Sequence, residues 1–211
     1  MGLISEIMPS LLNGLQTTML LFFIIVVTTL PLGFLVSLVR VYSPKPISWL
    51  VQVYIYVMRG TPLLLQLMFV FFGLPLVGIT FDRFTAAVIA FILNYAAYYA
   101  EIFRSGILSV PTAQFEALKV LGIGKVRGFR RVILPQILRV VLPSVGNEVI
   151  SLVKDTSLIY ILGIGELLRA GQIAANTYAS LVPFLAVGVF YMIITGVVTL
   201  ILNQIEKRFT F

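Results

Sequence analysis

Apolar residues dominate this chain in five long runs, which are separated by shorter polar segments. A helix needs about 20 residues to cross ~30 Å of hydrocarbon, and each run reaches that length. No linker divides the chain, so we expect a single transmembrane domain over residues 1–211. The pattern predicts membrane-spanning helices near residues 18–39, 49–73, 84–103, 137–163 and 183–205.

The residues before the first run form a separate pattern. Residues 1–16 place leucine and isoleucine at helical spacing. They contain no basic N-terminal region and no small-residue cleavage site, so we expect no cleaved signal peptide. We predict instead a short helix that lies on the membrane surface.

The composition supports membrane insertion. The chain is 60% hydrophobic and only 11% charged, whereas about a quarter of the residues in soluble domains are charged. It has no cysteine and no histidine, which excludes thiol and imidazole catalysis and the usual zinc and haem sites. The predicted fold class is therefore an all-α, polytopic membrane protein, and a membrane enzyme is disfavoured.

Lysine and arginine are distributed unequally between the segments that join the runs. Cytoplasmic loops of membrane proteins carry an excess of these residues. Placing the N-terminus outside and the C-terminus in the cytoplasm puts eleven of the fifteen on the inner side. The net charge of +7 thus reflects topology, and we expect no nucleic-acid partner. The inner residues are Arg40, Lys45, Arg104, Lys119, Lys125, Arg127, Arg130, Arg131, Arg139, Lys207 and Arg208.

The most cationic of these segments, residues 111–136, joins the third and fourth runs and is called here the coupling segment. It carries five lysines and arginines but one acid, Glu116, so it cannot lie in hydrocarbon. We predict a helix of two to three turns that begins after Pro111 and stops at Gly122. Either it offers a docking surface to a partner protein, or it is a solvated helix that holds two spans together.

A short motif in the coupling segment favours the docking surface. Glu116-Ala117, Gly122 and Ile133-Leu134-Pro135 follow a spacing that resembles the cytoplasmic loop signature of permease subunits of binding-protein-dependent ABC importers. Leu118 stands where that signature has a second alanine. The resemblance implies a type I importer fold, in which these seven residues form a coupling helix that sits in a cleft on the ATPase subunit.

The resemblance extends along nearly the whole chain and points to the polar amino-acid branch of these permeases. It implies a bacterial inner-membrane protein that works as a pair, with a second permease copy or a homologue. The further partners implied are a dimer of ATPase subunits, an extracytoplasmic solute-binding protein, a polar amino acid as substrate, and the lipid bilayer. The blocks that carry it are residues 59–62, 101–104, 129–136 and 154–158.

The chain has no phosphate-binding loop of its own. In the nearest match to that motif, around Gly124-Lys125, Lys119 stands at the first glycine position and Val126 follows the lysine. We therefore expect this chain to bind no cofactor. ATP and magnesium would bind to the partner ATPase.

The second run contains a predicted break. Pro62 disfavours helix at Thr61 and removes a backbone donor, and Gly60 stands just before them. Backbone groups freed at such a break can bind a polar ligand where they line protein or water. Arg59, which precedes the break, is either part of the substrate path or a structural ion-pair partner.

Further polar residues lie within the predicted spans. Glu148 and Asp155 are seven residues apart and hence on one helical face, and Asn94 and Tyr98 are four apart on another helix. Each acid either lines the substrate path or is paired internally, and Glu101 can pair with Arg104. The candidates for the substrate path are Arg59, Thr61, Asn94, Tyr98, Glu101, Asn147, Glu148, Asp155, Thr156 and Ser157.

The charges within the spans favour a substrate class. Glu101, Glu148 and Asp155 outnumber Arg59 and Lys154, which suits a basic amino acid such as arginine, lysine or histidine. Glutamine or another polar amino acid is the alternative substrate. The alternative function is a self-contained, ion-coupled secondary transporter or channel, which would leave the cationic coupling segment without a role.

Overall fold

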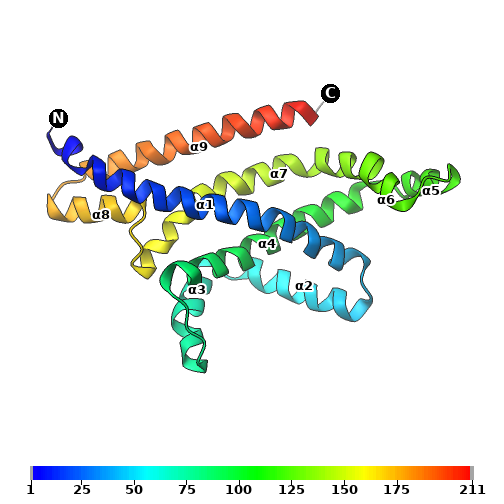
Figure 1. Ribbon diagram of the computed structural model, residues 1–211, viewed down its shortest axis with the longest axis horizontal. Helices are drawn as coiled ribbons and strands as arrows, with labels where there is room; N and C mark the ends of the chain where they lie inside the picture. The colour runs from blue at the N-terminus through cyan, green and yellow to red at the C-terminus, as the bar shows by residue number, and fades with distance from the viewer. Residues whose placement is uncertain (1, 210–211) are drawn as a thin grey trace.

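The computed structural model describes residues 2–209 of the protein, and every regular element in that range is a helix. Figure 1 shows most of them running along the long axis of the molecule. The elements are α1 (Gly2–Tyr42), α2 (Lys45–Gly60), α3 (Leu63–Met68), η1 (Phe69–Gly73), η2 (Leu74–Val77), α4 (Arg83–Ser109), α5 (Thr112–Val120), α6 (Lys125–Gly128), η3 (Phe129–Ile133), α7 (Leu134–Asp155), η4 (Thr156–Leu162), α8 (Leu167–Thr177) and α9 (Val182–Phe209).

Helix α1 is one continuous helix of 41 residues. The predicted surface helix at residues 1–16 is therefore wrong, although its first residue lies outside the described range. The apolar side chains Ile7 and Leu11 are buried against residues of α8 and α9, so protein rather than the membrane surface covers them. At 1.5 Å per residue α1 is about 62 Å long, roughly twice the thickness of the hydrocarbon.

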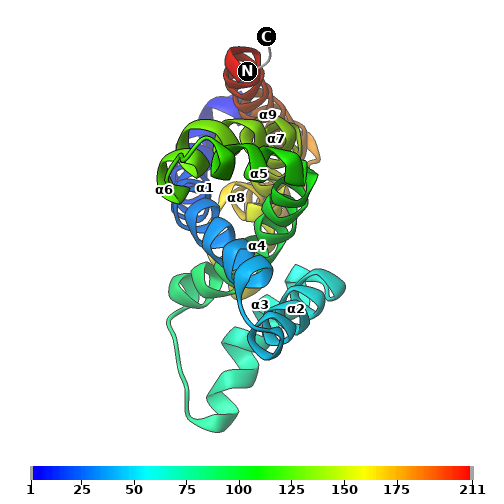
Figure 2. The ribbon, with the colours of Figure 1, turned by 90° about the vertical axis from the view of Figure 1, so that its right-hand side faces the viewer.

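The second run is broken as predicted. Helix α2 ends at Gly60, α3 begins after Pro62, and the two segments are bent by 105°. The chain continues through the π-helix η1 and the 3-10 helix η2 to Val77. Figures 1 and 2 show α2 and α3 beside the bundle that α1, α4, α7, α8 and α9 form.

Helix α4 is the central span. It begins at the side chain of Asp82, whose Oδ1 accepts hydrogen bonds from the backbone N–H groups of Phe84 and Thr85 at 3.0 and 3.1 Å. The hydrogen bonds from Thr85 hold the pKa of the Asp82 carboxyl below its usual range. Of the most apolar stretch of α4, 61% is buried, because α1, α2 and α7 all pack against it.

Helices α1 and α4 approach each other closely at Gly33. A Cβ atom added there would lie 2.5 Å from Cβ of Tyr99 and 3.1 Å from the backbone nitrogen of Ala100. No flexible side-chain end can move aside to relieve the first contact. Small residues allow helix backbones to come together in this way within membranes.

We expect Gly33→Ala to destabilise the protein, because the two helices must separate to admit the methyl group. Overpacking of this kind costs about 1–3 kcal/mol, which a lowered midpoint of thermal unfolding in detergent would report. The matched control is Gly188→Ala in α9, where an added Cβ meets no atom of the chain within 4 Å. Equal unfolding midpoints for the two variants would contradict the prediction.

The fourth run starts much earlier than the sequence predicted. Helices α6, η3, α7 and η4 follow one another without a break from Lys125 to Leu162, whereas we expected the span to begin near residue 137. The second half of the coupling segment is therefore already part of this rod. The rod tightens to a 3-10 helix at Thr156, whose hydroxyl donates to the carbonyl of Val153 at 2.7 Å.

The fifth run is helix α9, preceded by a helix that the sequence did not predict. Helix α8 is capped by the fully buried Glu166, whose carboxylate accepts from the backbone N–H groups of Leu168 and Arg169 at 2.7 and 2.6 Å. In the described residues, four helices can cross a membrane, and the bent pair α2 and α3–η2 supplies a fifth span. The all-α, polytopic fold class is confirmed.

Candidate functional site

A cavity of about 340 Å³ lies where the break after α2 meets α4 and α7. It is called here the acidic cavity. Among the residues that the structure describes, no lysine or arginine lines it. Glu148 and Asp155 both line it, so the spacing of seven residues on α7 does place them on one face. Its lining consists of Thr61, Pro62, Leu63, Leu64, Asn94, Tyr95, Tyr98, Glu148, Asp155 and Leu158.

The carboxylate of Asp155 is held by a residue that sequence reasoning missed. The hydroxyl of Tyr95 donates to Oδ2 of Asp155 at 2.7 Å, and its ring is buried. Tyr95 stands beside Asn94 on α4, next to the predicted polar stripe of Asn94 and Tyr98. The hydrogen bond orients one carboxylate oxygen and leaves the other available to the acidic cavity.

Two amide side chains satisfy the backbone at the break. Nε2 of Gln66 donates to the carbonyl oxygens of Met58 and Thr61 at 2.9 and 3.2 Å, and to the Thr61 hydroxyl at 2.8 Å. Nδ2 of Asn94 donates to the same Met58 carbonyl and to Oε1 of Gln66, both at 3.0 Å. These carbonyls lose their helical partners at the bend, so the two amides stabilise it.

Replacing Gln66 should therefore loosen the break. In Gln66→Leu the Met58 carbonyl keeps Asn94, but the half-buried Thr61 carbonyl loses its donor. Leaving a fully buried polar group unsatisfied costs about 1–3 kcal/mol, so the cost here should lie at or below the lower end of that range. We expect a lower midpoint of thermal unfolding in detergent. Gln136→Leu is the control, since the Gln136 amide bonds only the Val132 carbonyl of its own rod. A Gln66 variant as stable as this control would exclude the role.

Arg59 lies next to the acidic cavity without lining it. Its Cζ atom is 5.3 Å from the centroid of the Tyr98 ring, in a cation–π arrangement. Within the described part of the chain, Arg59 forms no ion pair, so the structural ion pair considered for it is not found there. Tyr98 itself lines the cavity, so the guanidinium stands behind one of its walls.

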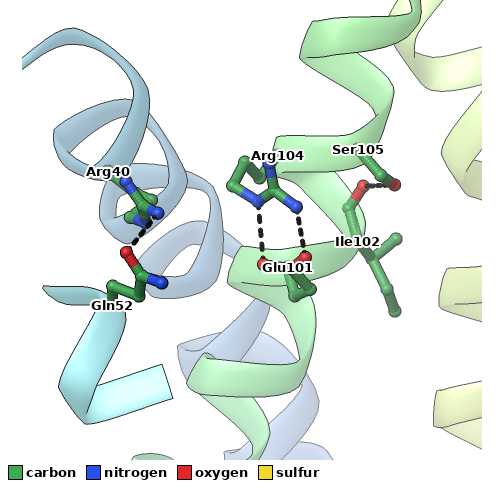
Figure 3. Close-up of polar contacts among 6 residues, drawn as sticks. All are labelled: Arg40, Gln52, Glu101, Ile102, Arg104 and Ser105. Atoms are coloured by element: carbon green, nitrogen blue, oxygen red, sulfur yellow. Dashed lines mark hydrogen bonds and ion pairs between the residues drawn. The ribbon is translucent and has the colours of Figure 1, made fainter. Parts of the chain in front are cut away.

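The other predicted residues do not reach the acidic cavity. Glu101 accepts from Nε of Arg104 at 2.9 Å and from a second guanidinium nitrogen (Figure 3), which is the internal pairing considered for it. Asn147 is exposed on α7, Thr156 is fully buried, and Ser157 is half-buried.

Helix α5 is the predicted coupling helix, and it projects from one end of the molecule in Figure 1. Glu116 and Ala117 are exposed, and no residue of α5 is buried. The helix ends at Val120, and Gly122, two residues later, has a φ of +66° that favours glycine. The N–H groups of Gly122 and Ile123 donate to the carbonyls of Lys119 and Leu118 at 3.1 and 3.0 Å, which confirms the predicted stop.

The remaining motif residues face inward. Leu118 is half-buried and packs against Gly128, where an added Cβ would lie 2.9 Å from the leucine Cδ1. Ile133 is buried in the main core, while Leu134 and Pro135 are half-buried at the start of α7. Leu118 therefore packs α5 against the rod that follows it.

Large apolar side chains are exposed at the same end of the molecule. Val120, Leu121 and Val126 are 85%, 72% and 82% exposed, beside the predicted coupling residues. Arg127, Arg130 and Arg131 line a nearby hollow together with Val126. Apolar surfaces rimmed by charged residues are typical of sites that contact a protein or a membrane.

A broken span beside a polar cavity, together with a short projecting helix, fits the class of membrane permeases. Residues 29–211 match the family described as "Binding-protein-dependent transport system inner membrane component", and the chain belongs to this family. It is a multi-pass inner-membrane subunit of a transporter and not an enzyme. Membership implies a solute-binding protein and a separate ATPase subunit as partners.

Several known amino-acid transport proteins are similar to this chain over almost its full length. It is 37% identical over 202 residues to the arginine transport system permease protein ArtQ of Bacillus subtilis (strain 168), covering 95% of this chain and 92% of ArtQ. It is 39% identical over 203 residues to the glutamine transport system permease protein GlnP of Escherichia coli (strain K12), covering 95% and 93%.

A solved structure is equally similar. The crystal structure of an amino acid ABC transporter with histidines superposes with a TM-score of 0.88 at 34% identity, covering 97% of this chain and 96% of that one. The resemblance drawn from the sequence, to ABC importer permeases of the polar amino-acid branch, is confirmed, and so is the type I importer fold.

Proposed function

We propose that this protein forms the transmembrane path of an ATP-driven amino-acid importer with a preference for basic amino acids. The observation that carries this preference is the acidic cavity, because its described lining contains two carboxylates and no lysine or arginine. Glu148 and Asp155 would hold a cationic side chain by charge-assisted hydrogen bonds. The similar permeases are named for arginine and for glutamine, so their names alone favour polar amino acids without distinguishing the charge.

The groups around the cavity suit the rest of an amino acid as well. Arg59 lies behind Tyr98, and a rotation of its side chain would bring a cation towards the α-carboxylate. Thr61 and Asn94 both line the cavity, and their side-chain oxygens could accept hydrogen bonds from the α-ammonium group. Glu101, Asn147, Thr156 and Ser157 would then support the path without contacting the solute.

The helices that line the acidic cavity also hold the coupling helix. Helix α4, which carries Asn94 and Tyr98, leads directly into α5. The rod from Lys125 to Leu162 follows α5 and carries Glu148 and Asp155. A movement of α5 is therefore transmitted through two rigid helices to opposite walls of the cavity. We propose that ATP and magnesium bind to the ATPase subunits, whose closure moves α5.

The proposed orientation places the N-terminus outside and the C-terminus in the cytoplasm. In Figure 1 the C-terminal end of α1, the start of α2 and the helices α5 and α6 lie towards the same end of the molecule. Most of the lysines and arginines are at that end, which favours the cytoplasmic side. The solute-binding protein would dock at the opposite end, near α8.

We propose that two permeases, either two copies of this chain or this chain and a homologue, enclose the path together. Only 6% of the most apolar stretch of α9 is buried, and exposed apolar side chains such as Leu185 and Met192 cover it. A bundle of five spans encloses a polar solute poorly, so a second subunit would close the path.

The decisive experiment reconstitutes the permease in proteoliposomes with its ATPase and its binding protein. We expect uptake of arginine and lysine that requires ATP hydrolysis, and weaker uptake of glutamine. Uptake by the permease alone along an ion gradient would instead establish the secondary transporter. ATP-driven uptake of glutamine in preference to arginine would keep the importer and overturn the basic preference.

A further inference from the structure

A second polar pocket, separate from the acidic cavity, lies at the turn between α1 and α2. It measures about 320 Å³ and is called here the basic pocket. It is formed where the C-terminal end of α1 and the start of α2 meet the last turns of α4. Its lining consists of Arg40, Val41, Ser43, Lys45, Ser48, Arg104 and Leu108.

The positive charge of the basic pocket is only partly compensated. Arg104 is paired with Glu101. Arg40 donates to the amide oxygen of Gln52 (Figure 3) and to the hydroxyl oxygen of Ser48. Both acceptors are neutral, so the charge of Arg40 remains. Within residues 2–209, the ammonium group of Lys45 has no hydrogen-bond or ion-pair partner in its own chain. Glu101, the acid that interacts electrostatically with Arg40, is already paired with Arg104. Within residues 2–209, Arg40 and Lys45 thus add two positive charges that no ion pair compensates.

The side chains around the basic pocket place it at the boundary of the hydrocarbon. Leu108, in the pocket wall, is 60% exposed, and Trp49 and Leu50 on the first turns of α2 are both 61% exposed. Tryptophan is enriched at the level of the lipid headgroups. A pocket with cations inside and apolar side chains at its rim matches an anionic headgroup with its acyl chains alongside.

We propose that the basic pocket binds the phosphate group of an anionic phospholipid such as phosphatidylglycerol or cardiolipin. Basic pockets between transmembrane helices on the cytoplasmic side take headgroups of this kind. The phosphate oxygens would accept hydrogen bonds from the free donors of Arg40 and Arg104, from the Ser43 hydroxyl and from the Lys45 ammonium. The acyl chains would lie along Leu50 and Leu108. This site does not depend on which amino acid the protein carries.

Trp49 provides the measurement, because it is the single tryptophan of the chain. The full-length permease is placed in vesicles that contain a phospholipid brominated on its acyl chains, and quenching of the Trp49 fluorescence reports that lipid beside the pocket. We expect brominated phosphatidylglycerol to quench more strongly than brominated phosphatidylcholine. The two quenching curves give the relative affinity for the anionic lipid.

The key variant is Lys45→Gln, which removes a charge without breaking a hydrogen bond of the chain. We expect it to weaken the preference for phosphatidylglycerol about fivefold, since a basic residue near a membrane contributes roughly that factor. Arg40→Gln should have a similar effect. The matched control, Lys207→Gln at the end of α9, removes an inner-side charge outside the pocket and should leave the preference unchanged.

Four results would overturn the proposal. Equal quenching by the two lipids would show that the pocket does not prefer the anionic lipid. If Lys207→Gln weakened the preference as much as Lys45→Gln, the preference would arise from the general surface charge of the protein and not from the pocket. Loss of the preference on addition of inorganic phosphate would identify a free anion as the occupant. Its loss on addition of the ATPase subunits would show that an acidic protein surface covers the pocket. If the preference for phosphatidylglycerol persists after addition of phosphate and after addition of the ATPase subunits, the result supports a bound lipid.

Discussion

Asp155→Asn should reduce ATP-dependent uptake of arginine at limiting concentration by roughly 30-fold or more, since truncating one partner of a buried charge pair costs about 2–5 kcal/mol. Asparagine can still accept the hydrogen bond of Tyr95, so the local structure should persist while the negative charge is lost. Uptake of glutamine should change much less, because glutamine presents no cation to the acidic cavity. Initial rates in proteoliposomes with the ATPase and the binding protein measure both.

The matched control for this variant is Asp82→Asn. Asp82 caps α4 outside the acidic cavity, and asparagine is an equally good cap, so arginine uptake should be unaffected. If Asp155→Asn slows arginine and glutamine uptake equally, the carboxylate does not select for charge, and its role is confined to the structure of the cavity.

The second large effect is expected for Glu116→Lys, which should abolish association with the ATPase. Glu116 is exposed on α5, so the variant should insert and fold normally. A charge of the wrong sign in a protein interface costs several kcal/mol, which corresponds to an affinity loss of about 30-fold or more. Co-purification of the two subunits from membranes measures the association.

Glu6→Lys serves as the control for charge reversal. Glu6 is also exposed, but it lies near the N-terminal end of α1 and not on α5. This variant should co-purify with the ATPase as the unmodified chain does. Normal co-purification of Glu116→Lys would mean that α5 is not the docking surface. The exposed apolar residues Val120 and Leu121 would then need another explanation.

The two variants separate the two halves of the proposed function. Asp155→Asn should retain the complex with the ATPase and its ATP hydrolysis but lose the selectivity for arginine. Glu116→Lys should retain the acidic cavity but no longer bind the ATPase. Stimulation of ATP hydrolysis by the loaded binding protein distinguishes these outcomes. It should persist in the first variant and disappear in the second.

Much of the fold follows from local sequence signals. Apolar length predicts the spans, and Pro62 after Gly60 predicts the break, because proline acts on its immediate neighbours. Gly122 predicts the end of α5 for the same reason, since only the local backbone conformation is involved. Helix α8 was missed because its eleven residues are too few for a membrane span. The acid that caps it, Glu166, was the one local signal for its start.

The composition of the site depends on contacts between distant segments. Helical spacing correctly placed Glu148 and Asp155 on one face, but it could not show that Glu101 turns away to Arg104. The role of Gln66 was not predicted from the sequence, because its amide finds the Thr61 carbonyl only after the backbone bends there.

The sequence by itself determined that this chain crosses a membrane, where its second span breaks, where helix α5 stops, and to which family it belongs. Those properties depend on hydrophobicity, on proline and glycine, and on short motifs, all of which act over a few residues. Only the tertiary structure decided which polar groups meet in the acidic cavity and which cations gather in the basic pocket. Buried polar groups are stabilised by partners from other helices, and the packing of those helices selects the partners.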